Sequence, residues 1–278
     1  MLISKNSTVN IKNTQYYGYD YTSRAILNNG TLTSTRSTYN ANHVNNNQRS
    51  KYLVGIENYG ILTSNYDTMN TSHGRTSAGV YNSSTNAVVI NNITVNNSNS
   101  NESYGIRHQS GENTSINGGE VTVTGNNNGF GLYVNSGLIT TGNVTYKAEN
   151  STGISRGAYL NGGTLNFESG SAIGIGAPTS YGIQLNTGTI NLGVEDGRGT
   201  DSAEVSTEYP YVKGIGTTTG IGLSMGNATF NYYDGKLVGS TSARGLTDIT
   251  SNTEKNYQVI NGEEEETGYK YCILEFIK

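Results

Sequence analysis

Apolar and polar residues alternate in short stretches along most of the chain, most clearly between Ser180 and Leu192. The apolar residues of this stretch are Ile183, Leu185, Ile190 and Leu192. Because successive side chains of an extended strand point to opposite faces, a spacing of two puts these residues on one face. The stretch therefore predicts two short strands, each with one apolar and one polar face, joined by a polar corner that contains glycine.

The first strand of this pattern recurs along the chain as a glycine followed directly by an aliphatic residue, at intervals of 24 to 26 residues. The clear copies are Gly55-Ile56, Gly79-Val80, Gly105-Ile106, Gly131-Leu132, Gly157-Ala158 and Gly182-Ile183. A degenerate copy precedes them at residues 24–32, and a late copy follows at residues 219–230 with its glycine at Gly220. A fixed interval of this kind indicates an internal repeat.

A second strand follows the first in each unit. We place it at Gly30-Thr31-Leu32, Gly60-Ile61-Leu62, Val88-Val89-Ile90, Gly119 to Val123, Gly137-Leu138-Ile139, Gly163 to Phe167 and Gly188 to Leu192. A weaker third strand is expected in some units, at Ile93 to Val95 and Val144 to Tyr146. One unit of this size cannot bury its own apolar face, whereas stacked units bury a continuous one.

These units predict an all-β fold, a right-handed parallel β-helix (β-solenoid) of about eight coils between residues near 15 and near 232. A β-sandwich or an up-and-down barrel needs turns every 8–12 residues but no constant repeat. The constant interval therefore favours the solenoid. We expect loops at residues 40–50, 66–77 and 193–216, the last of which is rich in acidic residues.

The pattern changes at Tyr233, so we divide the chain into a solenoid at 1–232 and a small C-terminal β appendage at 233–278. Strands are expected at residues 257–260 and 269–277, on either side of the acidic turn Glu263 to Glu266. We expect this appendage to cover the open end of the solenoid, where the last coil otherwise exposes unpaired backbone groups.

Composition excludes several classes of protein. Hydrophobic residues make up only 33% of the chain, but a net charge of -4, 21 Tyr and the strict local register argue against disorder. The single Cys272 excludes an internal disulfide. The mildly acidic balance does not favour nucleic-acid binding, and no apolar run approaches the ~18 residues of a membrane span. The N-terminus lacks the apolar segment of a signal peptide, so we expect the chain to be part of a longer polypeptide.

The composition of the coils and a motif near the C-terminus each resemble a known family. The Gly-, Asn- and Thr-rich coils resemble the β-helical passenger regions of bacterial adhesins and autotransporters. The segment Asn231 to Ala243, which contains Tyr-Asp-Gly-Lys, followed by Thr247 to Ile249, Tyr257 to Ile260 and Tyr269-Lys270, resembles a terminal module of very large Gram-positive surface proteins. The resemblance implies a secreted, extracellular or cell-surface parent protein, and it carries no catalytic residue to this chain.

Three patterns were tested for chemistry. Gly222 to Gly226 matches the Gly-x-Ser-x-Gly nucleophile elbow, but all three histidines precede Ser224, whereas the elbow needs a histidine after it. His43, His73 and His108 are ~30 residues apart, so stacking allows a histidine ladder, although isolated surface histidines fit better. Acids within the repeats share no repeat position: Glu57, Asp67, Glu102, Glu112, Glu120, Glu149 and Glu168. We therefore assign no catalytic, cofactor-binding or metal-binding residue.

Aromatic residues are the remaining candidates. Ten of the tyrosines lie in the repeats, at Tyr17, Tyr19, Tyr21, Tyr52, Tyr59, Tyr81, Tyr104, Tyr133, Tyr159 and Tyr181. Tyr104 and Tyr181 directly precede a repeat glycine, where a ring either packs over the glycine of the neighbouring coil or stacks on a sugar. The pairs Thr31/Thr33 and Thr122/Thr124 are similar to ice-binding faces but form no continuous array.

The sequence thus predicts a non-enzymatic structural or adhesive segment that displays loops or a polar face to glycans or proteins of a host or of a neighbouring cell. The alternative is a carbohydrate-active β-helix, either a polysaccharide lyase or a glycoside hydrolase. Such an enzyme needs carboxylates, or acids with Arg or Lys, converging on one sugar ring.

Overall fold

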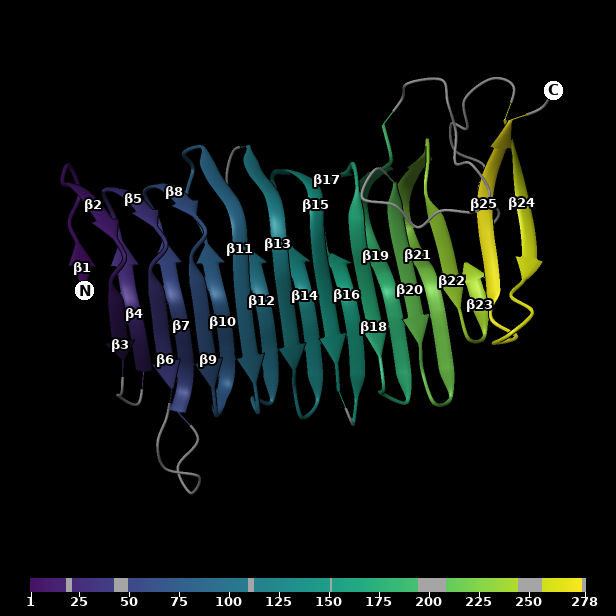
Figure 1. Ribbon diagram of the computed structural model, residues 1–278, viewed down its shortest axis with the longest axis horizontal. Helices are drawn as coiled ribbons and strands as arrows, with labels where there is room; N and C mark the ends of the chain where they lie inside the picture. The colour runs from purple at the N-terminus through teal and green to yellow at the C-terminus, as the bar shows by residue number, and fades with distance from the viewer. Residues whose placement is uncertain are drawn as a thin grey trace.

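The computed structural model describes residues 1–18, 22–42, 50–109, 113–150, 152–194, 209–244 and 257–276. Their strands stack along one long axis, with the two termini at opposite ends (Figure 1). Strands of successive coils pair in parallel, which makes a β-solenoid of about eight turns. The all-β parallel solenoid expected from the repeats is confirmed. The described residues contain no helix that is long and apolar enough to cross a membrane.

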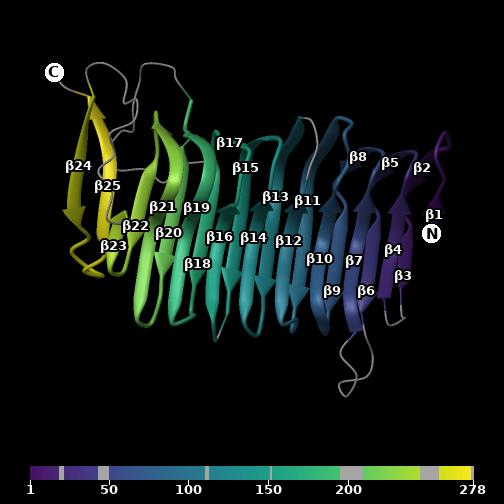
Figure 2. The ribbon, with the colours of Figure 1, turned by 180° about the vertical axis from the view of Figure 1, so that it is seen from behind.

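Each coil contributes to three parallel ladders, called faces A, B and C in chain order, and Figure 2 shows the same stack from behind. Face A contains β1 (Leu2–Ile3), β4 (Thr22–Asn28), β7 (Ser50–Asn58), β10 (Gly74–Asn82), β12 (Glu102–His108), β14 (Asn128–Val134), β16 (Ile154–Leu160), the first parts of β19 (Thr179–Leu192) and β21 (Thr219–Tyr232), and β23 (Ser242–Arg244).

Face B contains β2 (Thr8–Lys12), β5 (Thr31–Thr35), β8 (Ile61–Asn65), β17 (Thr164–Phe167), the first parts of β11 (Val88–Ser98), β13 (Thr114–Thr124) and β15 (Leu138–Glu149), and the second parts of β19 and β21. Face C contains β3 (Gln15–Gly18), β6 (Thr38–Asn42), β9 (Thr68–Ser72), the second parts of β11, β13 and β15, then β18 (Gly170–Ile175), β20 (Pro210–Ile215) and β22 (Lys236–Gly239).

Equivalent residues of successive coils form columns inside the solenoid. One aliphatic column on face A consists of Ile26, Ile56, Val80, Ile106, Leu132, Ala158, Ile183 and Leu223, which are at most 1% exposed. On face C the matching column includes Tyr39, Met69, Val95, Val121, Tyr146, Ala172, Val212 and Leu237. Stacked in this way, each coil buries the apolar face that it cannot bury alone.

The repeat glycines lie where face A touches face C. The residues before and after each glycine pair with the equivalent residues of the next coil, so Gly105, Gly131 and Gly157 stand above one another. A Cβ atom built on Gly105 would lie 2.1 Å from Cγ1 of Val121, and one built on Gly157 would lie 2.2 Å from the Ile173 backbone nitrogen. These glycines recur because only a residue without a side chain allows this close approach. In the late copy the register pairs Gly222 with Gly182, so our expectation of Gly220 there is corrected.

The third strand of each coil is more regular than expected, and two predicted loops are partly strands. Residues 66–77 contain β9 and the start of β10, and β20 lies within the predicted loop at 193–216. Residues 119–123 pair with residues 93–97, so they form a third strand and not a second one. Of the expected loop at 40–50, residues 43–49 lie outside the described part of the chain, as do residues 195–208.

The polar composition of β9 explains the correction at residues 66–77. In β9 only Met69 and Thr71 point inward, so the strand carries a single apolar residue in its sequence. The corner between faces B and C turns on one or two residues with positive φ, for example Asn92 at 52°, or Gly118 at 73° with Gly119 at 117°. Such a short corner gives no cluster of turn residues by which the two strands are separated in the sequence.

The C-terminal end is covered by an antiparallel hairpin of β24 (Tyr257–Glu263) and β25 (Lys270–Phe276). β25 pairs antiparallel with β22, the last strand of face C. Both strands and the covering role were expected, and Figure 1 shows the pair in yellow at the end of the stack. Parallel pairing continues past residue 233 to β22 and β23, so the change to antiparallel pairing comes later in the chain than the expected boundary.

Candidate functional site

Face A carries two columns of side chains outside the main core, which we call the aromatic strip. Val54, Ala78, Tyr104 and Phe130 of the strip are buried, and Tyr81, Tyr133 and Tyr159 pack over them partly exposed. The first column directly precedes the repeat glycines and contains Val54, Ala78, Tyr104, Phe130, Arg156 and Tyr181. The second column follows the glycines by two residues and contains Glu57, Tyr81, Arg107, Tyr133, Tyr159 and Gln184. The two columns run side by side along the axis of the solenoid.

A break in strand alternation brings these two columns onto the same surface. In a regular strand, residues three apart point to opposite faces. Here Ile106 is buried in the core, directly after Gly105, whereas the flanking Tyr104 and Arg107 both belong to the outer cluster of rings. The strand bends inward at its glycine to meet face C. The two columns therefore lie on either side of the glycines.

The rings of the strip pack against one another across coils. The Tyr104 and Phe130 rings stack in parallel, with centroids 4.8 Å apart and an angle of 4° between their planes. Tyr133 meets both rings edge-on at 5.5 and 5.6 Å, and Tyr159 lies 5.4 Å from Tyr133. Contacts of this kind fix ring orientation. Burial raises the pKa of Tyr104 to about 12, so its hydroxyl is neutral near pH 7.

Two arginines lie on the rings. The guanidinium carbon of Arg107 is 4.7 Å from the Tyr104 ring centroid and 5.6 Å from that of Tyr133. That of Arg156 is 4.8 Å from the Phe130 ring centroid and 5.4 Å from that of Tyr159. Distances below about 6 Å are those of cation–π contacts. These contacts place two positive charges within the aromatic surface.

The hydrogen-bond partners of both guanidiniums are neutral amides. Nε of Arg156 donates to Oε1 of Gln184, and its Nη1 is 3.5 Å from Oδ1 of Asn128. With its amide oxygen turned toward Arg107, Gln109 accepts from Nε of that residue at 2.6 Å. Within the described ranges, neither arginine forms an ion pair with a carboxylate. Burial lowers the pKa of the Arg156 guanidinium.

Carboxylates occur only in the N-terminal part of the strip as the structure describes it. Glu57 is 4% exposed, forms an ion pair with Arg24 and accepts a hydrogen bond from the Tyr59 hydroxyl at 2.7 Å. Glu102 lies beside the strip, with Oε2 3.5 Å from the hydroxyl of Thr76. The pairing with Arg24 neutralises Glu57, whereas Glu102 adds to the effect of burial in raising the pKa of Tyr104 and Tyr133, the rings under Arg107.

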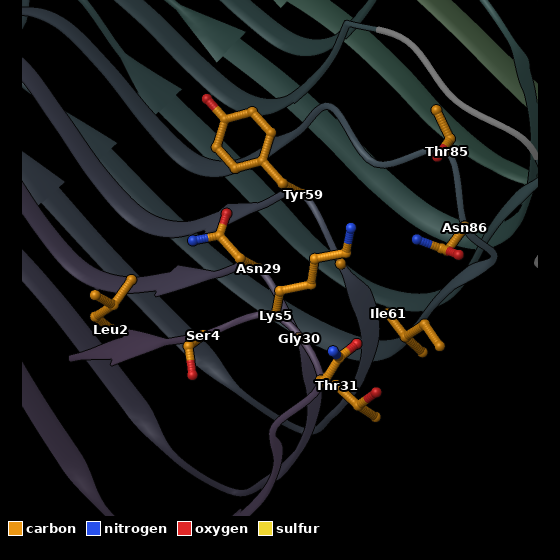
Figure 3. Close-up of a pocket in the computed structure, with 12 residues that line it drawn as sticks. Leu2, Ser4, Lys5, Asn29, Gly30, Thr31, Tyr59, Ile61, Thr85 and Asn86 are labelled. Carbon is orange, nitrogen blue, oxygen red and sulfur yellow. The ribbon is translucent and has the colours of Figure 1, made fainter.

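A hollow of about 740 Å³ lies at the corner of faces A and B near the N-terminal end. Figure 3 shows Leu2, Lys5, Asn29, Tyr59 and Ile61 around it. The Tyr59 and Tyr81 rings have centroids 6.2 Å apart, so the hollow adjoins the strip. Exposed apolar groups are concentrated here, because Leu2 is 65% exposed and Ile61 is 44% exposed.

The tyrosines named in the sequence divide into two groups. The strip brings together those at 52, 59, 81, 104, 133 and 159, and Tyr181 follows Arg156 in the first column. Tyr104 packs on the Phe130 ring of the next coil, a contact between rings that differs from the expected packing over a glycine. Tyr17 lies on face C, and Tyr19 and Tyr21 are outside the described residues. Sequence reasoning missed Arg107 and Arg156. Their positions relative to the repeat glycines, two after Gly105 and one before Gly157, could have placed them in the two columns.

The other candidates lie apart. Ser224 is inside strand β21, opposite Gln184, and not in a strand-to-helix turn. His73 occupies the corner between β9 and β10, whereas His108 is buried at the end of β12, and His43 is outside the described residues. Among the described residues no three His, Cys, Asp or Glu side chains come together.

The acidic candidates are equally dispersed. Asp67 is buried at the corner of faces B and C, where its carboxylate accepts from the Ser37 amide and the Ser64 hydroxyl. Burial raises the pKa of Asp67. Glu120 lies on face C, Glu149 pairs with Lys147, and Glu168 follows β17. Glu112 lies in a part of the chain that is not described.

The fold and the strip together define a three-sided β-solenoid with an aromatic and cationic outer face. In comparisons with known proteins, no family model, no curated protein and no solved structure matches the chain.

Proposed function

We propose that the chain is a non-catalytic structural and adhesive segment of a secreted bacterial cell-surface protein, and that it contacts glycans or proteins through the aromatic strip. The observation that supports the proposal is the strip itself. Its rings run across consecutive coils on the outside of a stiff repeat. The resemblance of the coils to adhesin passenger regions supports the location outside the cell.

The arrangement suits binding more than turnover. The rings are held by one another before any ligand arrives, so little side-chain entropy is lost on contact. Tyrosine and arginine are the residue types that dominate interface energetics, because they combine a large contact area with polar groups. A strip that follows the axis presents the same kind of contact at each step of about 4.8 Å between strands. It therefore suits an extended partner that is contacted at several points.

The proposal is tested by binding of the chain to immobilised polysaccharides and extracellular proteins, with Tyr133→Ala/Tyr159→Ala as the strip variant. We expect this variant to lose at least about ten-fold in affinity, since a stacked aromatic contributes about 1 kcal/mol or more. Tyr66→Ala is the matched control, because Tyr66 is an exposed tyrosine at the corner of faces B and C. Equal binding by the strip variant and the wild type would refute a role for the strip.

Release of reducing sugars, or of unsaturated products, from the same polysaccharides distinguishes adhesion from the enzymatic alternative. We expect none. Steady product release that is abolished by Glu57→Gln or Glu102→Gln would assign the chain to the carbohydrate-active enzymes. A gene that encodes an export signal upstream of this segment would support the surface location.

A further inference from the structure

We propose that the segment of the strip formed by Arg107, Phe130, Tyr133 and Arg156 binds an acidic polysaccharide, with carboxylates of the polymer on the two arginines and sugar rings on the aromatic surface between them. The inference rests on the proposed function, because it names the class of partner that the strip takes.

The four side chains form one connected group over three consecutive coils, β12, β14 and β16. Phe130 and Tyr133 come from the middle coil, and their ring centroids are 5.6 Å apart. Arg107 lies over Tyr133 from one side, and Arg156 lies over Phe130 from the other. Two strand steps of about 4.8 Å separate the arginines along the axis, so the group spans about 10 Å. Acidic groups on different rings of a polymer suit a spacing of this size.

Neither arginine forms an ion pair with a carboxylate in the described protein. Both are half-buried against rings, and their hydrogen-bond acceptors are the side-chain amides of Gln109, Gln184 and Asn128. Taking a charge out of water is unfavourable unless it is paired. A carboxylate supplies that pairing and accepts two parallel hydrogen bonds from a guanidinium. Arg24 shows the contrast within the same face, because Glu57 already pairs with it.

The backbone of this region favours a sugar over an acidic peptide. An extended peptide usually gains affinity by adding a strand to a free sheet edge. In contrast, β14 is paired on both sides, with β12 and with β16, so its backbone offers no edge. Phe130 is buried between the Tyr104 ring and the Arg156 guanidinium, so the ring that a sugar can reach at the centre of the group is that of the partly exposed Tyr133. What remains for recognition is therefore ring stacking and charge, which an acidic polysaccharide provides together.

The test is isothermal titration of the full chain with polygalacturonate, its fully methyl-esterified form, monomeric galacturonate and poly-glutamate. We expect the polymer to bind, its affinity to fall with added salt, and the ester and the monomer to bind at least about ten-fold more weakly. Arg107→Gln and Arg156→Gln should each reduce the affinity about ten-fold, since hydrogen bonds to a charged group are the stronger kind.

Matched variants separate recognition from folding. Arg36→Gln removes an arginine that also lies over a tyrosine, 5.2 Å from the Tyr66 ring centroid, but at another corner, so it should leave binding unchanged. Arg156→Lys keeps the charge and should retain part of the affinity, and thermal melting reports whether each variant is folded.

Equal binding of the ester, binding of poly-glutamate as tight as that of the polymer, or unchanged affinity of the Arg107→Gln/Arg156→Gln variant would each overturn the inference. Binding of a neutral polysaccharide that depends on Tyr133 but not on the arginines would overturn it and still support the proposed function. If the strip variants alter no glycan or protein contact, both fail.

Discussion

His108 ends a buried column of asparagines inside the solenoid. Nδ2 of Asn28 donates to Oδ1 of Asn58 at 2.7 Å, Nδ2 of Asn58 donates to Oδ1 of Asn82 at 2.8 Å, and Nδ2 of Asn82 is 3.1 Å from Nδ1 of His108. Donation by Asn82 requires an unprotonated Nδ1, so the ring is neutral. Burial lowers the pKa of His108 to about 4.

This pKa makes stability depend on pH. Unfolded chains bind a proton at His108 below pH 6.5, whereas the folded protein does so only near pH 4. The free energy of unfolding should therefore fall as the pH is lowered from 6.5 towards 4, by on the order of 3 kcal/mol from this residue. His108→Asn extends the asparagine column without a titrating group, so it should remove that part of the slope.

Denaturant unfolding at a series of pH values measures the effect. His73→Asn is the control for the loss of a histidine as such, because His73 lies in a turn with φ 68° that asparagine tolerates. An identical slope in the wild type and in His108→Asn would mean that the buried histidine does not titrate in this way.

At the scale of the strand, the sequence revealed the repeat because Gly105, Gly131 and their equivalents cannot be replaced without cost, so they mark each coil. It did not reveal the third strands, because inward positions such as Met69 and Thr71 alternate with polar ones that also suit loops. It also did not reveal the strip as one surface. Period-two alternation assigns Tyr104 and Arg107 to opposite faces, and only the inward bend at Gly105 places them together.

The bend predicts that Gly131→Ala destabilises the protein by about 1–3 kcal/mol, the usual cost of overpacking. The new Cβ would lie 2.5 Å from the Gly157 carbonyl oxygen and 2.9 Å from Cβ of Tyr146. Gly142→Ala is the matched control, because the nearest atom to its Cβ is Oγ of Ser169 at 3.5 Å, an ordinary contact. Thermal melting compares the two, and equal melting temperatures would contradict the close approach of faces A and C.

At the scale of the molecule, the C-terminal hairpin protects the last strand of face C. Leu274 is fully buried and Cys272 pairs with Leu237, so the hairpin is part of the core and not only a lid. A solenoid ends in strands whose backbone groups are ready to pair with another chain. The hairpin therefore sets where stacking stops.

Leu274→Asp should detach the hairpin, because it buries an unpaired charge against the core. The exposed edge of β22 should then make the protein associate, which light scattering after size-exclusion chromatography detects. Lys270→Gln removes only the partly exposed ion pair with Glu263 and should leave the molar mass unchanged. A monomeric Leu274→Asp protein would show that the hairpin does not guard this edge.

The regular stacking of face A also sets the distances between side chains along the axis in units of one coil. One coil takes 26 residues here, since Asn128 pairs with Ile154 of the next strand. Gain or loss of such a unit changes the separation of Arg107 and Arg156 by a whole increment of about 4.8 Å and leaves every remaining layer intact. In a chain built this way, the distance between the two arginines evolves by whole coils, while the rest of the fold stays the same.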